Sequence, residues 1–373
     1  MRSLCTCMAL LVLLVAVSIP FLTKLLYPSD NLAFTLDQVA NDGSARNVVV
    51  TGANSGLGLA TVEHMAQLPN SHVIMACRSM AKCETARSSV KKKHATARLS
   101  CIPLDLGSRT SIESFATILQ QHLDKTNSSV ESLEKQPIHI LVNNAGQMGN
   151  SKTIGYIDNV ETHIQVNHLG HVLLTHCLWK HLLMGKGRIV NVSSLAALLP
   201  VNPVKAWTPA TATVDVAADK SGWSAFLDNF TGNWLYYARS KRANLMFTSE
   251  LHHLYKNTVV TAVASHPGYT RTPLLQNGFQ FVPEAFRSLM HNNRIGSASP
   301  KEGAMTQVRA ALDDHLVGGV HVGPKNWTAG EAVPVGTVLG WTSHHWPFSR
   351  EESRLLWTQS LDTLGIREFG VSI

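Results

Sequence analysis

The chain has 373 residues, of which 45% are hydrophobic, and its formal net charge is +7. This length is enough for a large buried core and could hold two domains, but we expect one domain with additions. The one dense basic run, Lys91–His94, has no interleaved aromatic residues, so we predict no nucleic-acid binding. Attraction to a membrane surface is a better use of the excess charge.

Cysteine and histidine positions give no sign of a metal centre. Six cysteines are scattered at positions 5, 7, 77, 83, 101 and 177 and do not form a disulfide framework. Cys5 and Cys7 lack partners at zinc-finger spacing, and none of the 18 histidines lies in a His-Glu-x-x-His arrangement. We therefore predict no metal site and interpret His168, His171 and His176 as ordinary core or surface residues.

The N-terminal segment is apolar. Residues 4–23 carry no charge and lie between Arg2 and Lys24. At about 1.5 Å rise per residue, such a segment would span the ~30 Å core of a bilayer as a helix. We expect residues 1–27 to form a single-pass membrane anchor, in the endoplasmic reticulum. The alternative is a cleaved signal peptide, favoured by the small residues near Ala16–Ser18, which would make the protein secreted or lumenal.

From residue 47 onward, apolar runs typical of strands alternate with helical stretches. We predict strands at 47–51, 72–76, 99–103, 138–142, 187–192 and 258–264, and helices at 57–68, 80–94, 108–123 and 160–183. The strands lack polar alternation, as strands do when helices cover both faces of a parallel sheet. This order predicts an α/β fold with a doubly wound parallel sheet, the Rossmann fold, over residues 45–275.

The remaining residues, 276–373, are expected to form a C-terminal extension that packs on the same domain. Within it, Ser349-xx-Glu352 is a capping box that predicts a helix ending near Gly365. The extension also contains Trp327, Trp341, Trp346 and Trp357. Packing in a core is the more common role of such aromatic residues, and substrate contact is the alternative.

A glycine-rich turn, Thr51-Gly-Ala-Asn-Ser-Gly-Leu-Gly58, follows the first strand. Glycines at this point let the backbone approach a pyrophosphate, whose charge then lies on free amides at the helix start. The turn predicts a dinucleotide site made by Gly52, Asn54, Ser55, Gly56, Leu57 and Gly58. An ordinary strand-to-helix turn is the alternative, since the spacing differs from Gly-x-Gly-x-x-Gly.

Polar residues also follow the later strands. They are Arg78-Ser79, Asp105, Asn143–Gly146, Ser193-Ser194 and Pro267-Gly268. Carboxyl ends of parallel strands meet at one edge of a sheet, so these residues are candidates for function. Tyr237 and Lys241, four residues apart at the predicted opening of a helix, lie on one helix face.

The ordered set of motifs resembles the classical short-chain dehydrogenase/reductase family over residues 45–275. The set consists of Thr51–Gly58, Asn143–Gly146, Asn167, Ser194, Tyr237-xxx-Lys241 and Pro267-Gly268. The runs Ala76–Ser79 and Arg188–Leu195 look most like the retinol dehydrogenase and protochlorophyllide reductase-like branch.

This resemblance implies four catalytic residues. Tyr237 would exchange a proton with the substrate oxygen, Lys241 would lower the pKa of Tyr237 and bind the nicotinamide ribose, and Ser194 would orient that oxygen. A phenol titrates near pH 10, so acid/base action close to neutrality needs a shift of about 3 units, or ~4 kcal/mol. Asn167 would hold a water of the proton relay; a buried capping asparagine is the alternative.

Two neighbours are rejected as members of this set. The serine of the family precedes an apolar residue, which selects Ser194 over Ser193. Only Tyr237 has a lysine four residues later, which selects it over Tyr236.

The choice of cofactor depends on Arg78. NAD enzymes commonly place an acid after the second strand, whereas arginine would attract a 2′-phosphate, so we favour NADP(H) and leave NAD(H) open. A solvent-facing strand end is the alternative for Arg78.

The resemblance also implies further cofactor-binding residues. It places Asp105 near the adenine, Asn144, Ala145 and Gly146 beside the cofactor, and Pro267, Gly268 and Thr272 along the nicotinamide and diphosphate. Simple turn chemistry is the alternative for these loops.

Ser194 and Tyr237 lie further apart in this chain than in the family. The intervening residues 196–232 contain Pro200, Pro203 and Pro209, and we expect an irregular lid over the substrate mouth rather than a helix.

The tryptophans of the C-terminal extension would make the entrance to the site apolar. Together with the membrane anchor, an apolar entrance predicts a lipophilic small-molecule substrate, such as a retinoid, steroid or lipid-derived carbonyl or alcohol. Two other functions of the chain are the alternatives: a non-catalytic nucleotide-binding scaffold or sensor, and a light-dependent tetrapyrrole reductase. A homo-oligomer is compatible with the sequence.

Overall fold

The computed structural model describes residues 34, 36, 44–126, 137–148, 157, 160–198, 201–203, 223–272, 274, 298–325, 332–334 and 348–370. The predicted anchor, residues 1–27, lies outside them. Within these described ranges, no helix combines the length and the apolar character that crossing a membrane requires.

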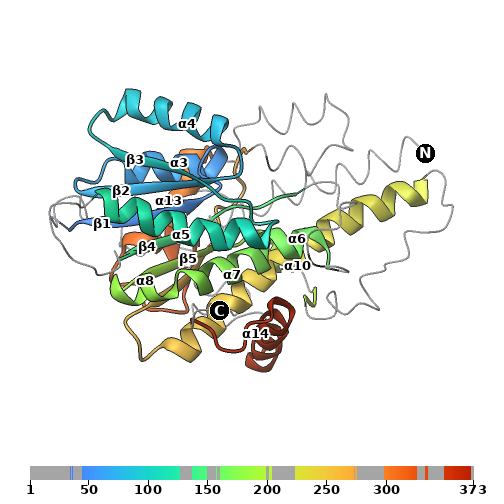
Figure 1. Cartoon of the computed structure of the whole chain (residues 1–373). Helices are drawn as coiled ribbons and strands as arrows, with labels where there is room; N and C mark the ends of the chain where they lie inside the picture. The colour runs from blue at the N-terminus through green and yellow to red at the C-terminus, as the bar shows by residue number, and fades with distance from the viewer. Residues whose placement is uncertain are drawn as a thin grey trace.

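Eight strands form one sheet in the order β3-β2-β1-β4-β5-β6-β7-β8 (Figure 1). Their bounds are β1 (Arg46–Thr51), β2 (Ser71–Cys77), β3 (Arg98–Pro103), β4 (Ile140–Asn143), β5 (Arg188–Val192), β6 (Thr261–Ser265), β7 (His321–Pro324) and β8 (Ala332–Pro334). Strands β1 to β7 pair in parallel, and β8 pairs antiparallel with β7. The parallel sheet is therefore confirmed, with β7 and β8 as additions that the sequence did not predict.

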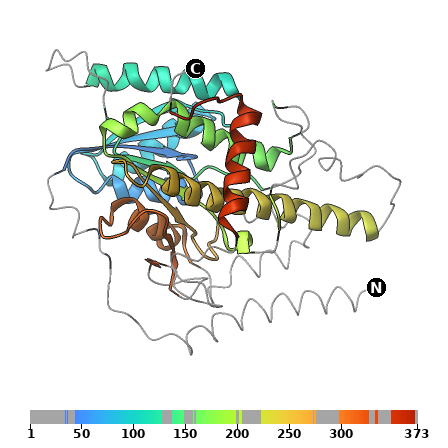
Figure 2. The same ribbon diagram turned by 90° about the horizontal axis from the view of Figure 1, so that it is seen from below.

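Helices cover both faces of the sheet (Figure 2). One layer contains α3 (Gly56–Met65), α4 (Met80–Lys93) and α13 (Pro300–Leu312), and the other contains α5 (Arg109–Thr126), α7 (Gly170–Cys177), α8 (Trp179–Met184), α10 (Trp223–Tyr255) and α14 (Arg350–Leu364). Alternate residues of β1 enter the two cores: Val48 and Val50 pack with Met65 of α3, and Val49 packs with Phe115 of α5. This alternation explains why the strands read as continuous apolar runs.

The predicted helix 160–183 is interrupted, which corrects the sequence-based expectation. It consists of α6 (Thr162–Ile164), a π-helix η1 (Gln165–Leu169), α7 and α8. Gly170 follows the π-turn where the helix touches the loop after β3, and a Cβ there would lie 2.6 Å from the Leu106 carbonyl oxygen. Such π-turns leave no simple trace in hydrophobic periodicity and occur often at functional sites.

The segment before Tyr237 is also more helical than predicted. Helix α10 begins at Trp223, so residues 223–232 are not irregular and Tyr237 does not open its helix. The three prolines of the segment all precede Trp223, so none of them interrupts the helix. A short 3₁₀ helix, η2 (Leu195–Leu198), follows β5. The rest of the predicted lid, apart from residues 201–203, lies outside the described residues.

One disulfide joins Cys83 and Cys101, although the scattered cysteines gave no sign of a disulfide framework. The two residues are 18 positions apart, on α4 and β3, and their Cα atoms lie 6.1 Å apart. Helix α4 packs on β3, which brings the two side chains together. This pairing depends on the packing of a helix on a strand, which cysteine spacing alone does not reveal.

The helix predicted from the capping box is confirmed. In α14 the Ser349 hydroxyl accepts from the Glu352 amide, and the Glu352 carboxylate accepts from the Ser349 amide. The helix ends at Gly365, whose φ of 64° is left-handed. Trp357 packs in the core, as expected, while Trp327, Trp341 and Trp346 lie outside the described residues.

Candidate active site

The glycine turn closes tightly between β1 and α3. Gly52 and Gly56 have φ values of 65° and 54°, which favour glycine. A Cβ on Gly58 would lie 2.3 Å from the Gly52 carbonyl oxygen, so a side chain there would disrupt the turn. Ser55 precedes α3 without a side-chain hydrogen bond to the helix start, which leaves amides there for an anion. The other predicted residues of the turn, Asn54 and Leu57, are half-buried.

The loop after β4 is bonded to this turn. The amides of Asn144 and Ala145 each donate to the Thr51 hydroxyl at 2.9 Å, and the Asn144 side chain donates to the Thr51 carbonyl oxygen at 2.7 Å. Strands β1 and β4 are neighbours where the strand order reverses. The carboxyl ends of strands at such a point form a crevice in which ligands bind in doubly wound sheets.

Tyr237 and Lys241 lie on α10 and face the end of β5. Burial raises the pKa of Tyr237 to about 12, although a side-chain hydrogen bond with Ser194 acts in the opposite direction. Burial lowers the pKa of Lys241 to about 8. The predicted lowering of the Tyr237 pKa is therefore not found in the chain alone, because the loss of hydration outweighs the hydrogen bond with Ser194.

The two serines after β5 have different environments. Ser193 is buried, and its hydroxyl donates to the Lys241 carbonyl oxygen at 2.8 Å. Ser194 is half-buried, bonds Tyr237 and accepts from the Ala196 amide at 3.2 Å. Ser193 thus ties the strand to α10, while the structure brings Ser194 together with Tyr237.

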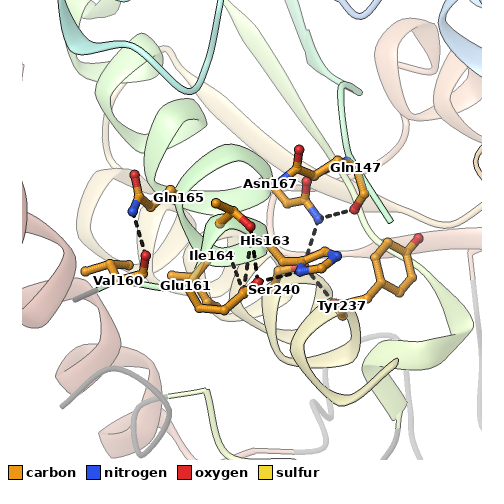
Figure 3. A network of polar contacts seen from close by, with 10 residues as sticks. Gln147, Val160, Glu161, His163, Ile164, Gln165, Asn167, Tyr237 and Ser240 are labelled. Carbon is orange, nitrogen blue, oxygen red and sulfur yellow. Dashed lines mark hydrogen bonds and ion pairs between the residues drawn. The ribbon is translucent and has the colours of Figure 1, made fainter. Parts of the chain in front are cut away.

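Asn167 lies in the π-helix at the centre of a polar network (Figure 3). Its side chain accepts from the Gln147 amide at 2.7 Å and donates to the Gln147 carbonyl oxygen and the Ser240 hydroxyl, both at 3.0 Å. Ser240 in turn donates to the Tyr237 carbonyl oxygen at 2.7 Å. The asparagine therefore joins the loop after β4 to the helix that carries Tyr237.

Gly146 completes the contact between this loop and α10. A Cβ on Gly146 would lie 3.3 Å from Lys241 Nζ and 3.5 Å from Asn167 Oδ1. The structure thus brings Asn167, Lys241 and Gly146 together, although they are distant in the sequence.

Arg78 and Asp105 follow β2 and β3 at the same edge of the sheet. Arg78 is exposed, and no acidic side chain of the described residues forms an ion pair with it. Asp105 Oδ1 accepts from the Gly107 amide at 2.9 Å, and the Asp105 amide donates to the Ser111 hydroxyl at 2.9 Å. The turn chemistry considered as the alternative for Asp105 is therefore present.

Residues 267–272 form a turn after β6. Gly268 has a φ of 67°, and its amide donates to His266 Nδ1 at 3.2 Å. Thr270 donates to the Pro267 carbonyl oxygen at 2.8 Å, and Thr272 is buried. This places the predicted Pro267, Gly268 and Thr272 at the same edge as the other candidates.

Sequence reasoning missed several residues that hold this site. Gln307 of α13 donates to the Thr61 hydroxyl of α3 at 2.7 Å, and its position in the unpredicted α13 gave no signal. His171 contacts both Thr51 and Asn167, and the four-residue spacing from Asn167 was a signal that could have been used. Among the described residues, no group of three or more metal-ligating side chains could hold a metal ion.

Comparison with known proteins decides the family. The family model for short chain dehydrogenases matches residues 46–216. Retinol dehydrogenase 12 from Mus musculus is 36% identical over 72% of this chain and 74% of its own length. The chain belongs to the short-chain dehydrogenase/reductase family. Retinol dehydrogenase 11 from Homo sapiens is 31% identical over 86% of both chains, and this short-chain dehydrogenase/reductase is therefore an oxidoreductase of the retinol dehydrogenase-like branch.

Solved structures agree on the fold of this short-chain dehydrogenase/reductase. The NADPH-bound carbonyl reductase from chicken fatty liver matches with a TM-score of 0.51 and 21% identity, over 80% of this chain and 99% of its own. At this identity the similarity shows the fold alone.

Proposed function

We propose that this oxidoreductase transfers hydride between NADP(H) and a carbonyl or alcohol group of a lipophilic substrate. The observation that carries the proposal is the convergence of Ser194, Tyr237 and Lys241 beside the end of β5. The same edge of the sheet carries the glycine turn, which has no room for a side chain at Gly58. A dinucleotide whose pyrophosphate lies at this turn would supply the hydride from its nicotinamide.

Side chains of the protein donate the proton and stabilise the charge that forms when it is transferred. With its pKa raised to about 12, Tyr237 is a neutral phenol near pH 7, the form that a general acid needs. In reduction, its hydroxyl donates a proton to the carbonyl oxygen while the carbonyl carbon receives the hydride; oxidation reverses both transfers. Ser194, bonded to Tyr237, is placed to donate to the same oxygen, and the Lys241 cation favours the phenolate that remains.

Arg78 supports NADP(H) rather than NAD(H). It is an exposed guanidinium after β2, and Ser79 behind it accepts from the Lys82 amide as the N-cap of α4. A guanidinium binds a phosphate through strong charge-assisted bonds, whereas a ribose hydroxyl is better served by an acid. The chicken carbonyl reductase, which binds NADPH in its crystal structure, is a parallel at the level of the fold.

The proposed substrate class follows from the relatives. Retinol dehydrogenases 12 and 11 are among the similar proteins, so a retinoid or another apolar carbonyl compound is the proposed substrate. We also propose that residues 1–27 anchor the chain in a membrane, where such compounds partition. A non-catalytic scaffold is disfavoured because Ser194, Tyr237 and Lys241 are all present and placed together.

The test is turnover by the purified full-length chain in detergent or vesicles. NADPH and NADH are each offered with retinal, a keto-steroid and long-chain aldehydes, in the dark, with Tyr237→Phe as the matched control. We expect dark NADPH oxidation that depends on Tyr237. Cofactor binding without turnover across the panel would support the scaffold, and turnover only in light would support a tetrapyrrole reductase.

A further inference from the structure

His171 lies on α7, one turn after Asn167, and connects two parts of the site. Its Nε2 atom lies 2.9 Å from the Thr51 hydroxyl, at the start of the glycine turn, and its Nδ1 atom lies 3.1 Å from the Asn167 carbonyl oxygen. The three residues are almost completely buried, with exposures of 1% or less. Bulk water therefore does not compete for these bonds.

The partners fix the tautomer of the ring. A carbonyl oxygen can only accept, so Nδ1 carries the proton and donates it to Asn167. Nε2 is then an acceptor for the Thr51 hydroxyl, 2.9 Å away; the other acceptor near this hydroxyl, the Val142 carbonyl oxygen, is more distant at 3.3 Å. The same hydroxyl accepts from the amides of Asn144 and Ala145, so its one proton and its two lone pairs are all used.

These bonds form one directional chain. It runs from the amides of the loop after β4, through Thr51 and His171, to the backbone of Asn167 in the π-helix. Burial lowers the pKa of His171 to about 3, and the nearby Lys241 and His168 act in the same direction. The neutral ring is thus the form that this chain of donors and acceptors requires.

We propose that His171 is a positioning residue that couples the glycine turn to Asn167, so that the cofactor cradle and the π-helix hold one relative arrangement. This inference rests on the proposed function, because it assigns His171 a role in binding the nicotinamide dinucleotide. The residue touches neither the substrate nor the proposed proton donor. Its effect passes through Thr51 and Asn167.

Variants that keep one of the two bonds separate this role from simple packing. In His171→Asn, the amide can still donate to Asn167 but does not reach Thr51; in His171→Gln, the longer amide can reach Thr51. Thr51→Val removes the hydroxyl and keeps the shape, and Thr51→Ser restores the hydroxyl. His176→Gln is the matched control, because His176 lies on the same helix, is buried, and bonds the Gly370 amide instead.

The readouts are the Kd for NADPH from fluorescence titration and amide hydrogen exchange of residues 143–147 in cofactor-free protein. We expect His171→Asn to raise the Kd about tenfold and to speed this exchange, as loss of one buried hydrogen bond predicts. Thr51→Val also removes the acceptor of the Asn144 and Ala145 amides, so its effects on both readouts should be at least as large. The double variant should add little to the effect of Thr51→Val alone, because that change already breaks the bond to His171. Thr51→Ser, His171→Gln and His176→Gln should bind NADPH within about threefold of the wild type.

Unchanged NADPH binding and exchange in His171→Asn would overturn the inference, as would an equal loss of affinity in His176→Gln. Should His171→Asn fail to fold, Thr51→Val and His171→Gln decide: unchanged binding in the first, or a loss in the second as large as that of Thr51→Val, contradicts the coupling. Wild-type protein that binds neither NADPH nor NADH would instead refute the proposed function itself.

Discussion

Lys241 donates from Nζ to the backbone carbonyl oxygen of Val192, 3.0 Å away at the end of β5. Val192 also accepts from the Asn244 side chain at 3.3 Å, so this carbonyl fixes α10 on the sheet. The lysine lies 5.8 Å from the centre of the Tyr237 ring and is almost completely buried. The carbonyl dipole holds the Lys241 cation between Tyr237 and the proposed position of the nicotinamide ribose. Burial disfavours this charge, which is why the pKa of Lys241 is lowered.

This lowered pKa predicts a specific pH dependence of stability. Lys241 has a pKa of about 8 when folded, against 10.5 as the ordinary value, so between these values the unfolded chain binds more protons. The free energy of unfolding should therefore rise as pH increases above about 8. Tyr237, with its pKa raised from 10.0 to about 12, reverses the trend above pH 10.

Lys241→Met is the control for this prediction. The wild type should gain up to ~1.4 kcal/mol per pH unit relative to the variant between pH 8 and 10 in urea unfolding of cofactor-free protein. Parallel pH profiles for the two proteins would show that the Lys241 pKa is not lowered.

Removing the phenol hydroxyl should abolish turnover while leaving the fold intact. Tyr237→Phe keeps the buried ring but loses the proton donor, and we expect kcat to fall ~10²- to 10⁴-fold with the Kd for NADPH little changed. Tyr236→Phe is the matched control on the adjacent position. If both variants lose activity equally, Tyr237 is not the proton donor.

The sequence predicted most of the sheet and the candidates at its edge because apolar runs and glycine positions are local signals. Val48 to Val50 read as a strand whose two faces are both buried, and the structure confirms this. The π-helix around Asn167 was missed because a π-turn leaves no mark in hydrophobic periodicity. The start of α10 at Trp223 was missed because the prolines earlier in the segment favoured an irregular lid. Cys83 and Cys101 meet only because α4 packs on β3.

The environment of Tyr237 could not be predicted from the motif either. The family resemblance implied that Lys241 lowers the pKa of Tyr237, but burial raises this pKa to about 12 in the chain alone. Spacing specifies which side chains share a helix face, whereas desolvation depends on everything packed around them.

The two adjacent serines should give opposite phenotypes. Ser194→Ala removes the partner of Tyr237, and we expect kcat/KM to fall ~10²-fold with normal stability. Ser193→Ala removes the buried bond to the Lys241 carbonyl oxygen and should cost ~1 kcal/mol of stability with a smaller effect on kcat/KM. Thermal unfolding and steady-state kinetics on both variants distinguish the roles, and exchanged phenotypes would assign the catalytic role to Ser193.

The cofactor preference should depend on the charge at position 78. Arg78→Asp places an acid after β2, which repels a 2′-phosphate and can accept from a ribose hydroxyl. We expect the Kd for NADPH to rise about tenfold or more while that for NADH stays equal or falls. Lys91→Asp is the charge-matched control, because Lys91 lies in the last turn of α4, at the opposite end of this helix from Arg78. An unchanged ratio of the two Kd values in Arg78→Asp would show that Arg78 does not contact the cofactor.

Deuteride transfer shows whether hydride passes from NADPH to the carbonyl carbon of the substrate. Full-length protein is incubated in the dark with retinal and NADPH carrying deuterium at the transferable position, and the alcohol product is analysed by mass spectrometry. We expect a product with one deuterium at the former carbonyl carbon, formed by the wild type and absent with Tyr237→Phe. Protein that binds NADPH yet yields no deuterated alcohol from retinal, the keto-steroid or the long-chain aldehydes would contradict the proposed function.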